Sequence, residues 1–353
     1  CFAHVRHGRR QIVFVTGDAG IGKTTLVEAF VHQLGAEAGL WVGRGQCIEH
    51  YGTGEAYLPV LEALGRLGRM SDGAPLVACL RQYAPLWLMH LPALLPLETR
   101  ATVQHQGQGM TRERMVRELA EALEALTVER PVLLVLEDLH WSDPSTVEAL
   151  ALLTRRRETA RLLVLGTYRP ADLIIHNHPL KRVKQELVMH GHCTEVPLGG
   201  LRQEAVAAYL AQRQAAPEGR EDLAAFVYRR TEGHPLFMVQ VVDYLVQQGI
   251  SLTSAPPAAD RAELLLRNLE VPQGLRGLID AQIEQLVSTE QEVLQIGSVA
   301  GVEFAVASIA ATLPASQDVV EAVCDRLARC GQFLEERGLA EWPDGTISGR
   351  YGF

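Results

Sequence analysis

The sequence is poor in lysine and in aromatic residues, and it carries no excess of positive charge. Only Lys23, Lys181 and Lys184 among its 33 basic residues are lysine, and Phe, Trp and Tyr together make up 6% of the chain. The formal net charge is −9. A chain of this charge has no general attraction for nucleic acid or for an anionic membrane surface. A lysine that falls inside a motif is correspondingly informative.

Disulfide and membrane patterns are missing as well. The six cysteines are scattered without a Cys-x-x-Cys pair, which indicates reduced core thiols rather than a disulfide or zinc framework. There is no signal peptide and no apolar run of membrane-spanning length. The most apolar segment, 296–313, is interrupted by Glu303 and is expected to form a packed pair of short helices. We therefore expect a cytoplasmic protein with no membrane partner.

The first two-thirds of the chain alternates strand and helix patterns. Apolar, β-branched runs predict strands at 11–17, 40–47, 132–137, 161–169 and 194–198. Helices are expected between them, notably at 23–34 and at 112–127, where Met115, Leu119, Leu123 and Leu126 form one apolar stripe. This alternation predicts an α/β fold with a doubly wound parallel sheet. The helical insert over 55–127 is longer than one crossover requires.

After residue 200 the strand patterns stop. Helices are predicted at 202–213, 220–230, 235–249 and 273–287. From residue 288 a capping box at 288–291, a helix at 317–330 and a hairpin around the Pro-Asp-Gly of 343–345 are typical of a winged helix. We expect three domains, 1–199, 200–287 and 288–353, the last a winged helix truncated at its C-terminus. The chain is expected to be a piece of a longer protein.

The segment GDAGIGKTT, residues 17–25, fits the pattern G-x-x-x-x-G-K-[ST] between a strand and a helix. Glycines at 17, 20 and 22 let successive backbone N–H groups face one anion, and the helix N-terminus adds its partial positive charge. Lys23 is expected to reach the β- and γ-phosphates, and the Thr24 hydroxyl to bind Mg²⁺. The predicted nucleotide-binding residues here are Gly17, Asp18, Ala19, Gly20, Ile21, Gly22, Lys23, Thr24 and Thr25.

Two acids and an arginine follow neighbouring predicted strands. Glu137 and Asp138 come at the end of VLLVLE, where one acid would hold Mg²⁺ and a second would orient the attacking water. Arg169 ends the next strand and would contact the γ-phosphate, because ligands of such sheets bind beyond the carboxyl ends of the strands. An ordinary surface arginine without a functional role is an equally good interpretation of Arg169. How Glu137 and Asp138 divide their tasks stays open.

Four segments in this order, GDAGIGKTT, LLVLEDLHWSDPST, LLVLGTYRP and TEGHPLFMVQVVDYL, resemble the STAND ATPases, which are signalling relatives of AAA+ proteins. They resemble in particular the bacterial regulator ATPases fused to winged-helix DNA-binding, adenylate or guanylate cyclase, or Ser/Thr kinase domains. The resemblance implies an ATP-binding, slowly hydrolysing switch that uses Mg²⁺, self-associates with ATP and is closed with ADP. It also implies sensor repeats and an effector domain, which this chain does not contain.

The resemblance also assigns residues. Glu137 and Asp138 match the Walker B acids, Arg169 matches the sensor arginine, and Gly233-His234-Pro235 matches the G-x-P motif of a helical lid. It implies that Pro235 packs on the nucleotide base, whereas position alone makes Pro235 a good first helical residue. The chain departs from many relatives in having Glu137 in place of Asp. Only ten residues precede the first strand, where relatives carry an element that contacts adenine.

Two other functions compete with the switch. A DNA-engaging AAA+-type motor or loader would use the winged helix on DNA, and a small-molecule kinase would use the same phosphate loop. A kinase rarely needs a G-x-P lid, so we rank it last. Residues 288–353 are not markedly basic, since Arg326, Arg329, Arg337 and Arg350 stand among several acids, and direct DNA binding by this chain is therefore not expected.

Overall fold

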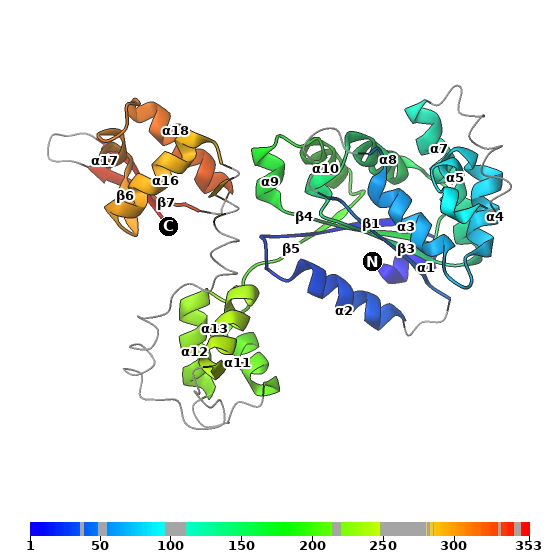
Figure 1. Ribbon diagram of the computed structural model, residues 1–353, viewed down its shortest axis with the longest axis horizontal. Helices are drawn as coiled ribbons and strands as arrows, with labels where there is room; N and C mark the ends of the chain where they lie inside the picture. Colours follow the sequence, from blue (N-terminus) through cyan, green and yellow to red (C-terminus); the bar gives the residue numbers. More distant parts are fainter. Residues whose placement is uncertain are drawn as a thin grey trace. The chain divides into compact units, whose positions relative to one another are not determined.

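The computed structural model describes residues 1–35, 39–48, 55–95, 111–213, 220–247, 280, 283–284, 286–330, 333–341 and 347–353. They belong to two compact units, Cys1–Leu198 and Gly199–Phe353, and each is described by itself (Figure 1). The domain boundaries expected from the sequence stay a prediction. Among the described residues, no helix combines the length and the apolar character needed to cross a membrane.

Unit 1 is built on a five-stranded parallel sheet. The strands are β1 (Gln11–Thr16), β2 (Trp41–Gln46), β3 (Val132–Glu137), β4 (Leu162–Tyr168) and β5 (Thr194–Pro197), in the order β2-β3-β4-β1-β5. All five strands therefore end at the same edge of the sheet. The predicted parallel α/β architecture is confirmed, and no strand end differs from its predicted position by more than one residue.

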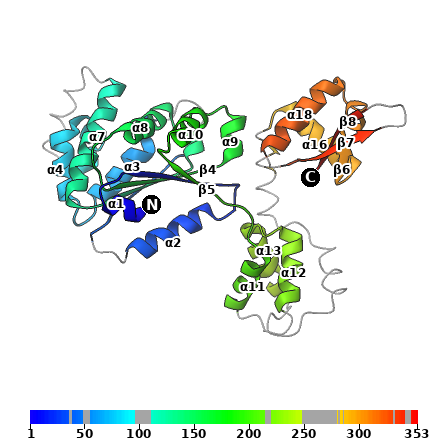
Figure 2. The same cartoon turned by 180° about the vertical axis from the view of Figure 1, so that it is seen from behind.

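Helices cover both faces of this sheet (Figures 1 and 2). Ile12 and Phe14 of β1 point into a core shared with α7 (Arg112–Glu129), α8 (Pro144–Arg155) and α10 (Leu180–Met189). Val13 and Val15 point to the opposite face, where α1 (Phe2–Arg6) and α2 (Lys23–Gly35) pack. Alternate residues of one strand thus serve two cores, which is why the strand is apolar throughout.

The insert between β2 and β3 is helical, as predicted. It comprises α3 (Leu58–Gly68), α4 (Ala74–Tyr83), α5 (Pro85–Met89), η1 (Pro92–Leu94) and α7. The predicted stripe of α7 is buried, and the helix continues two residues beyond 127. Trp87 of α5 is fully buried, and its indole N–H donates to the carbonyl oxygen of Met115 at 2.7 Å. The insert is therefore part of the same hydrophobic core as the sheet and is not a separate appendage.

Two glycines of β2 allow α3 to lie directly on the strand. A Cβ atom at Gly45 would lie 1.7 Å from the carbonyl oxygen of Pro59, and one at Gly43 would lie 2.8 Å from a methyl carbon of Leu67. No side chain fits at Gly45, so close backbone packing sets this position.

Unit 2 begins with α11 (Gln203–Gln212), α12 (Arg220–Thr231) and α13 (Pro235–Gln247), which confirm the helices predicted there. Their shared core contains Val206, Leu210, Val227 and Val242. Between α12 and α13, Gly233 has φ +74°, and a Cβ on it would lie 1.9 Å from the carbonyl oxygen of Leu201. This explains the glycine of Gly233-His234-Pro235 from packing inside unit 2.

The last part of unit 2 combines helices with a small antiparallel sheet. The elements are α16 (Ser288–Ala300), β6 (Glu303–Ala305), α17 (Val306–Ala310), α18 (Gln317–Cys330), β7 (Glu335–Glu341) and β8 (Ile347–Gly352), and the sheet order is β6-β8-β7. The hairpin strands were predicted, whereas the turn at 343–345 and most of the helix predicted at 273–287 lie outside the described residues.

One local prediction in this region is incomplete and one is wrong. The segment 296–313 does contain two helices, the end of α16 and the whole of α17, but Gly301 at φ +131° ends α16, and Glu303–Ala305 between the helices pair with β8 as β6. The capping box does not start at Ser288, because α16 is preceded by Val287, whose N–H donates to the Glu290 carboxylate at 3.0 Å. Valine has no side-chain acceptor, so only the Glu290 half of the box exists.

Candidate functional site

The loop after β1 has a conformation that requires glycine. Gly17, Gly20 and Gly22 have φ of +145°, +77° and +98°, and α2 starts immediately afterwards at Lys23. A Cβ on Gly17 would lie 2.8 Å from the carbonyl oxygen of Leu198. Ala19 and Ile21 are buried under the loop, and Thr25 is exposed. The residues 17–25 thus form a tight turn that leads into a helix N-terminus, where anions are favoured.

Lys23 lies folded against this loop. Its Nζ donates hydrogen bonds of 2.7 Å to the carbonyl oxygens of both Gly17 and Asp18, and only 8% of the residue is exposed. Burial, and then the positive charge of Arg169, lower the pKa of Lys23 to about 8. The charged ammonium group therefore loses part of its hydration when it packs against the loop. An anionic ligand beside it would compensate for that loss.

The two acids at the end of β3, Glu137 and Asp138, contact different partners. The Thr24 hydroxyl donates to Oε2 of Glu137 at 3.1 Å, so the start of α2 and the end of β3 meet there. Asp138 has a left-handed backbone with φ +56°, and its N–H donates to the Thr167 hydroxyl of β4 at 3.0 Å. Its carboxylate accepts from the Gln46 side chain at 3.3 Å. Glu137 thus points to the phosphate loop, and Asp138 points to β2.

Arg169 follows β4 and precedes α9 (Pro170–Ile175). Its Nη1 lies 3.7 Å from Oδ2 of Asp172, and its buried Nε has no hydrogen-bond partner among the described residues. The positive charge of Arg169 lowers the pKa of Lys23, and the negative charge of Asp172 raises it. A long cation with an orphaned donor beside the loop is able to turn toward an incoming anion.

Behind this arginine lies a buried histidine, in η3 (Leu139–Trp141). Nε2 of His140 lies 3.2 Å from Oδ2 of Asp172, but the geometry is not that of a hydrogen bond. Burial, and then the charges of Arg169 and Lys23, lower the pKa of His140 to about 3, so the ring is neutral. Burial also raises the pKa of Asp172, against the opposing charge of Arg169. The pair is therefore not an ion pair at neutral pH.

The remaining aromatic residue of this segment packs. The Trp141 ring lies 5.1 Å from the ring of His140 and 5.4 Å from that of His176, measured between centroids. Asp143 accepts from the N–H groups of Ser145 and Thr146 and so caps α8, whose first residue is Pro144. The residues after the acids are thus fixed by packing and capping.

Most of the predicted site residues come together in unit 1. Lys23, Thr24 and Glu137 are joined through the contacts above, Asp138 follows Glu137, and Arg169 is close enough to influence Lys23. Pro235 starts α13 in unit 2 and is described only with its neighbours there. Sequence reasoning missed two polar residues: Gln46 at the end of β2, and Asp172, three residues after Arg169.

The oxygen donors of this site fit a magnesium ion. Mg²⁺ prefers carboxylate and hydroxyl oxygens, and those of Thr24 and Glu137 are already 3.1 Å apart, with the Asp138 carboxylate on the next residue. Bound there, the ion would neutralise phosphate charge. The class of protein that the fold and this site define is a P-loop ATPase module.

Comparisons with known proteins agree with that class. Residues 1–165 match the family described as AAA ATPase domain. An uncharacterized protein of Rhizobium meliloti is 25% identical over 320 residues, which are 87% of this chain and 29% of that protein. The chain therefore spans less than a third of this relative's length.

One solved structure is similar to this chain in fold, and a second is a weaker match. A Walker-type ATPase of Pyrococcus abyssi has a TM-score of 0.56 at 13% identity, over 98% of this chain and 90% of that one. A STAND protein of Pyrococcus horikoshii with a tetratricopeptide repeat sensor has a TM-score of 0.40 at 16% identity, over 92% of this chain and 38% of that one. At 13% identity the similarity to the Pyrococcus abyssi ATPase shows the fold alone. The TM-score of the STAND protein is too low to support a conclusion.

Proposed function

We propose that this chain is the ATP-hydrolysing switch module of a larger bacterial signalling or transcriptional regulator. The observation that carries the ATPase part is the 3.1 Å contact between the Thr24 hydroxyl and Glu137, combined with the separate anchoring of Asp138. Thr24 and Glu137 would hold Mg²⁺, and Asp138 would orient the attacking water. The different hydrogen-bond partners of the two acids support this division.

In the proposed reaction a water oxygen forms a bond to the γ-phosphorus while the bond from that phosphorus to the β–γ bridging oxygen breaks. Asp138 accepts the hydrogen bond of the water and takes its proton, and the products are ADP and phosphate. Lys23 and Arg169 stabilise charge on the transferred group. Asp18, Ala19, Gly20, Ile21 and Gly22 would surround the phosphates with backbone N–H groups.

The regulatory part of the proposal rests on the segments shared with the STAND class and on unit 2. α11–α13 would be the helical lid, with Pro235 against the base, and α16–α18 with β6–β8 would be a winged helix. ADP would favour a closed form, ATP an open and self-associating one, and slow hydrolysis would reset the switch. Sensor repeats and an effector would be supplied by the rest of the protein, in the cytoplasm.

Charge pairing in unit 2 supports a switch over a DNA-engaging motor. Each of the four arginines considered for DNA contact lies in an ion pair, Arg326 with Glu290, Arg329 with Asp325, Arg337 with Glu335 and Arg350 with Glu303, at 2.7, 3.6, 2.9 and 2.6 Å. Arginines already paired with acids leave little charge for a phosphate backbone.

Exchanging the acids one at a time tests the proposed roles. Glu137→Gln should weaken ATP binding in the presence of Mg²⁺, with little effect in its absence. Asp138→Asn should keep Mg²⁺–ATP affinity within about threefold and reduce hydrolysis by about a hundredfold or more, since only the water would lose its acceptor. Calorimetry and phosphate release measure the two effects.

Lys23→Ala should abolish nucleotide binding. It is the negative control with which the binding by the two acid variants is compared. If Asp138→Asn instead removes the Mg²⁺ dependence of binding, the two roles are exchanged. If neither acid variant changes hydrolysis, the chain is not the proposed ATPase.

A further inference from the structure

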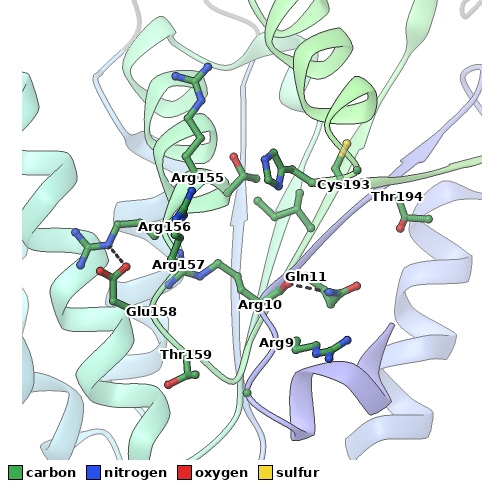
Figure 3. Close-up of a pocket in the computed structure, with 15 residues that line it drawn as sticks. Arg9, Arg10, Gln11, Arg155, Arg156, Arg157, Glu158, Thr159, Cys193 and Thr194 are labelled. Atoms are coloured by element: carbon green, nitrogen blue, oxygen red, sulfur yellow. Dashed lines mark hydrogen bonds and ion pairs between the residues drawn. The ribbon is translucent and has the colours of Figure 1, made fainter.

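A hollow in unit 1 lies at the amino-terminal edge of the sheet. It has a volume of about 450 Å³ and is lined by residues of three segments, 8–12, 154–159 and 191–194 (Figure 3). The segments meet because β4, β1 and β5 are neighbours in the sheet and each segment precedes or opens one of them. The six residues of β1 span about 20 Å between this hollow and the phosphate loop. The two sites are therefore separate.

The lining of this hollow is strongly basic (Figure 3). It includes five arginines, Arg9, Arg10, Arg155, Arg156 and Arg157. A lysine crowded by other cations sheds its proton, but a guanidinium stays charged at any pH a protein tolerates. The positive charge of these arginines therefore persists at every such pH and favours a nearby anion, supplied either by the chain or by a ligand.

One partly buried carboxylate, that of Glu124, pairs with two of the arginines. Glu124 accepts from Arg10 at 2.9 Å and from Arg156 at 2.6 and 2.8 Å. Burial alone would raise the pKa of Glu124, but the hydrogen bonds from Arg156 and Arg10 outweigh it and lower the pKa. Arg10 also donates to the carbonyl oxygen of Leu153 near the end of α8. Arg10 and Arg156 are thus fixed in place by their contacts with α7 and α8, and they form the rigid wall of the hollow.

Two more carboxylates are exposed partners. Glu186 lies 2.9 Å from a guanidinium nitrogen of Arg155, and Glu158 lies 3.3 Å from Nε of Arg156. Exposed pairs of this kind contribute little stability and rearrange readily.

Arg9 and Arg157 are exposed, and neither makes an ion pair with any residue that the structure describes. The five arginines outnumber the three carboxylates that pair with them, Glu124, Glu158 and Glu186, by two, although the net charge of the chain is −9. The negative charge of Glu121 also raises the pKa of Arg156, but Glu121 makes no ion pair with it among the described residues. The excess is therefore local to this hollow, and the described residues supply no paired counter-anion for Arg9 or Arg157.

We propose that this hollow binds a small ligand that carries two or more phosphate groups. Guanidinium groups bind phosphate through two parallel hydrogen bonds, and the volume lies in the range of small-molecule sites. Arg9 and Arg157 would contact the ligand, and the fixed arginines would complete the positive field. An acidic peptide or a nucleic acid strand is less suited, because each needs an extended track of charge.

Inorganic tripolyphosphate is the probe, used on the full chain with Lys23→Ala to disable the phosphate loop. We expect one site per chain by calorimetry. Adding Arg9→Ala and Arg157→Ala should weaken binding by about tenfold or more, because two charge-assisted contacts are lost. Arg117→Ala with Arg182→Ala is the matched control: both residues are exposed, lie outside the hollow and remove the same charge. The control should keep the affinity.

Absence of binding in the Lys23→Ala chain would overturn the proposal without touching the ATPase. Equal weakening by both double variants would do so as well, because it would show a diffuse charge effect. Poly-glutamate or single-stranded DNA that binds through Arg9 and Arg157 more tightly than tripolyphosphate would also overturn it and identify another class of ligand. Thermal unfolding of each variant verifies that it is folded.

Discussion

At the scale of single residues, Lys23 has the property that most directly links the site to a measurable quantity. Burial and the charge of Arg169 lower its pKa to about 8, whereas a triphosphate beside it would raise the pKa again. Below pH 8 the free protein already carries the proton. Above pH 8, binding must restore the proton, so ATP affinity should fall by up to about tenfold per pH unit until the bound-state pKa is reached.

Calorimetry in two buffers of different ionisation enthalpy measures this effect. Proton uptake on ATP binding should be near zero at pH 7 and approach one per chain at pH 9. Lys23→Arg keeps a positive charge that does not titrate in this range, so its ATP affinity, whatever its value, should not show this decline. Equal proton uptake by both chains at pH 9 would mean that another group is responsible.

The residues of the candidate site were predictable to different degrees. Lys23, Thr24, Glu137 and Arg169 each follow a strand or open a helix, and the parallel topology brings such positions to one edge. Asp172 could not be predicted as a site residue in this way. Its neighbour His140 belongs to η3, and the two residues come together only in the folded chain. Gln46 was missed because a polar residue ending a strand is ordinarily solvated.

At the scale of elements, the contact of β2 with α3 makes a sharp stability prediction. A Cβ at Gly45 would lie 1.7 Å from a backbone oxygen of Pro59, which cannot move without shifting the start of α3. Gly45→Ala should therefore lower the free energy of unfolding by about 2 kcal/mol or more. Gly199→Ala is the control, since its Cβ would meet nothing within 4 Å and its φ is not in the left-handed region.

Urea denaturation of the two variants gives the comparison, read from the transition in which the near-ultraviolet signal of the tryptophans, buried Trp87 among them, is lost. If both variants unfold at the same midpoint, α3 moves away from β2 at little cost, and the insert is looser than its packing indicates.

Elements with a long apolar period were predictable, and short ones were not. The stripe of α7 and the runs of β1, β3 and β4 each have one dominant pattern. β6 has only three residues, and it exists because Gly301 ends α16 and β8 offers a partner far along the chain. A strand that depends on a distant partner leaves no local period to recognise.

At the scale of the whole molecule, the proposed switch requires unit 2 to respond to the nucleotide held in unit 1. Pro235 is the residue on which this proposal can be tested alone. It is the first residue of α13, where alanine also fits a helix, so Pro235→Ala should leave the three-helix core intact. Any effect on nucleotide would then come from a lost contact.

We expect Pro235→Ala to accelerate ADP release by roughly tenfold, because an apolar ring that packs on the base contributes about 1.4 kcal/mol. Stopped-flow displacement of a fluorescent ADP analogue measures the rate. Pro85→Ala is the matched control, since Pro85 is the exposed first residue of α5 and lies in the insert. An ADP release rate that is the same in both variants and in the unaltered chain would remove α13 from the nucleotide site, while the ATPase assigned to unit 1 would stand.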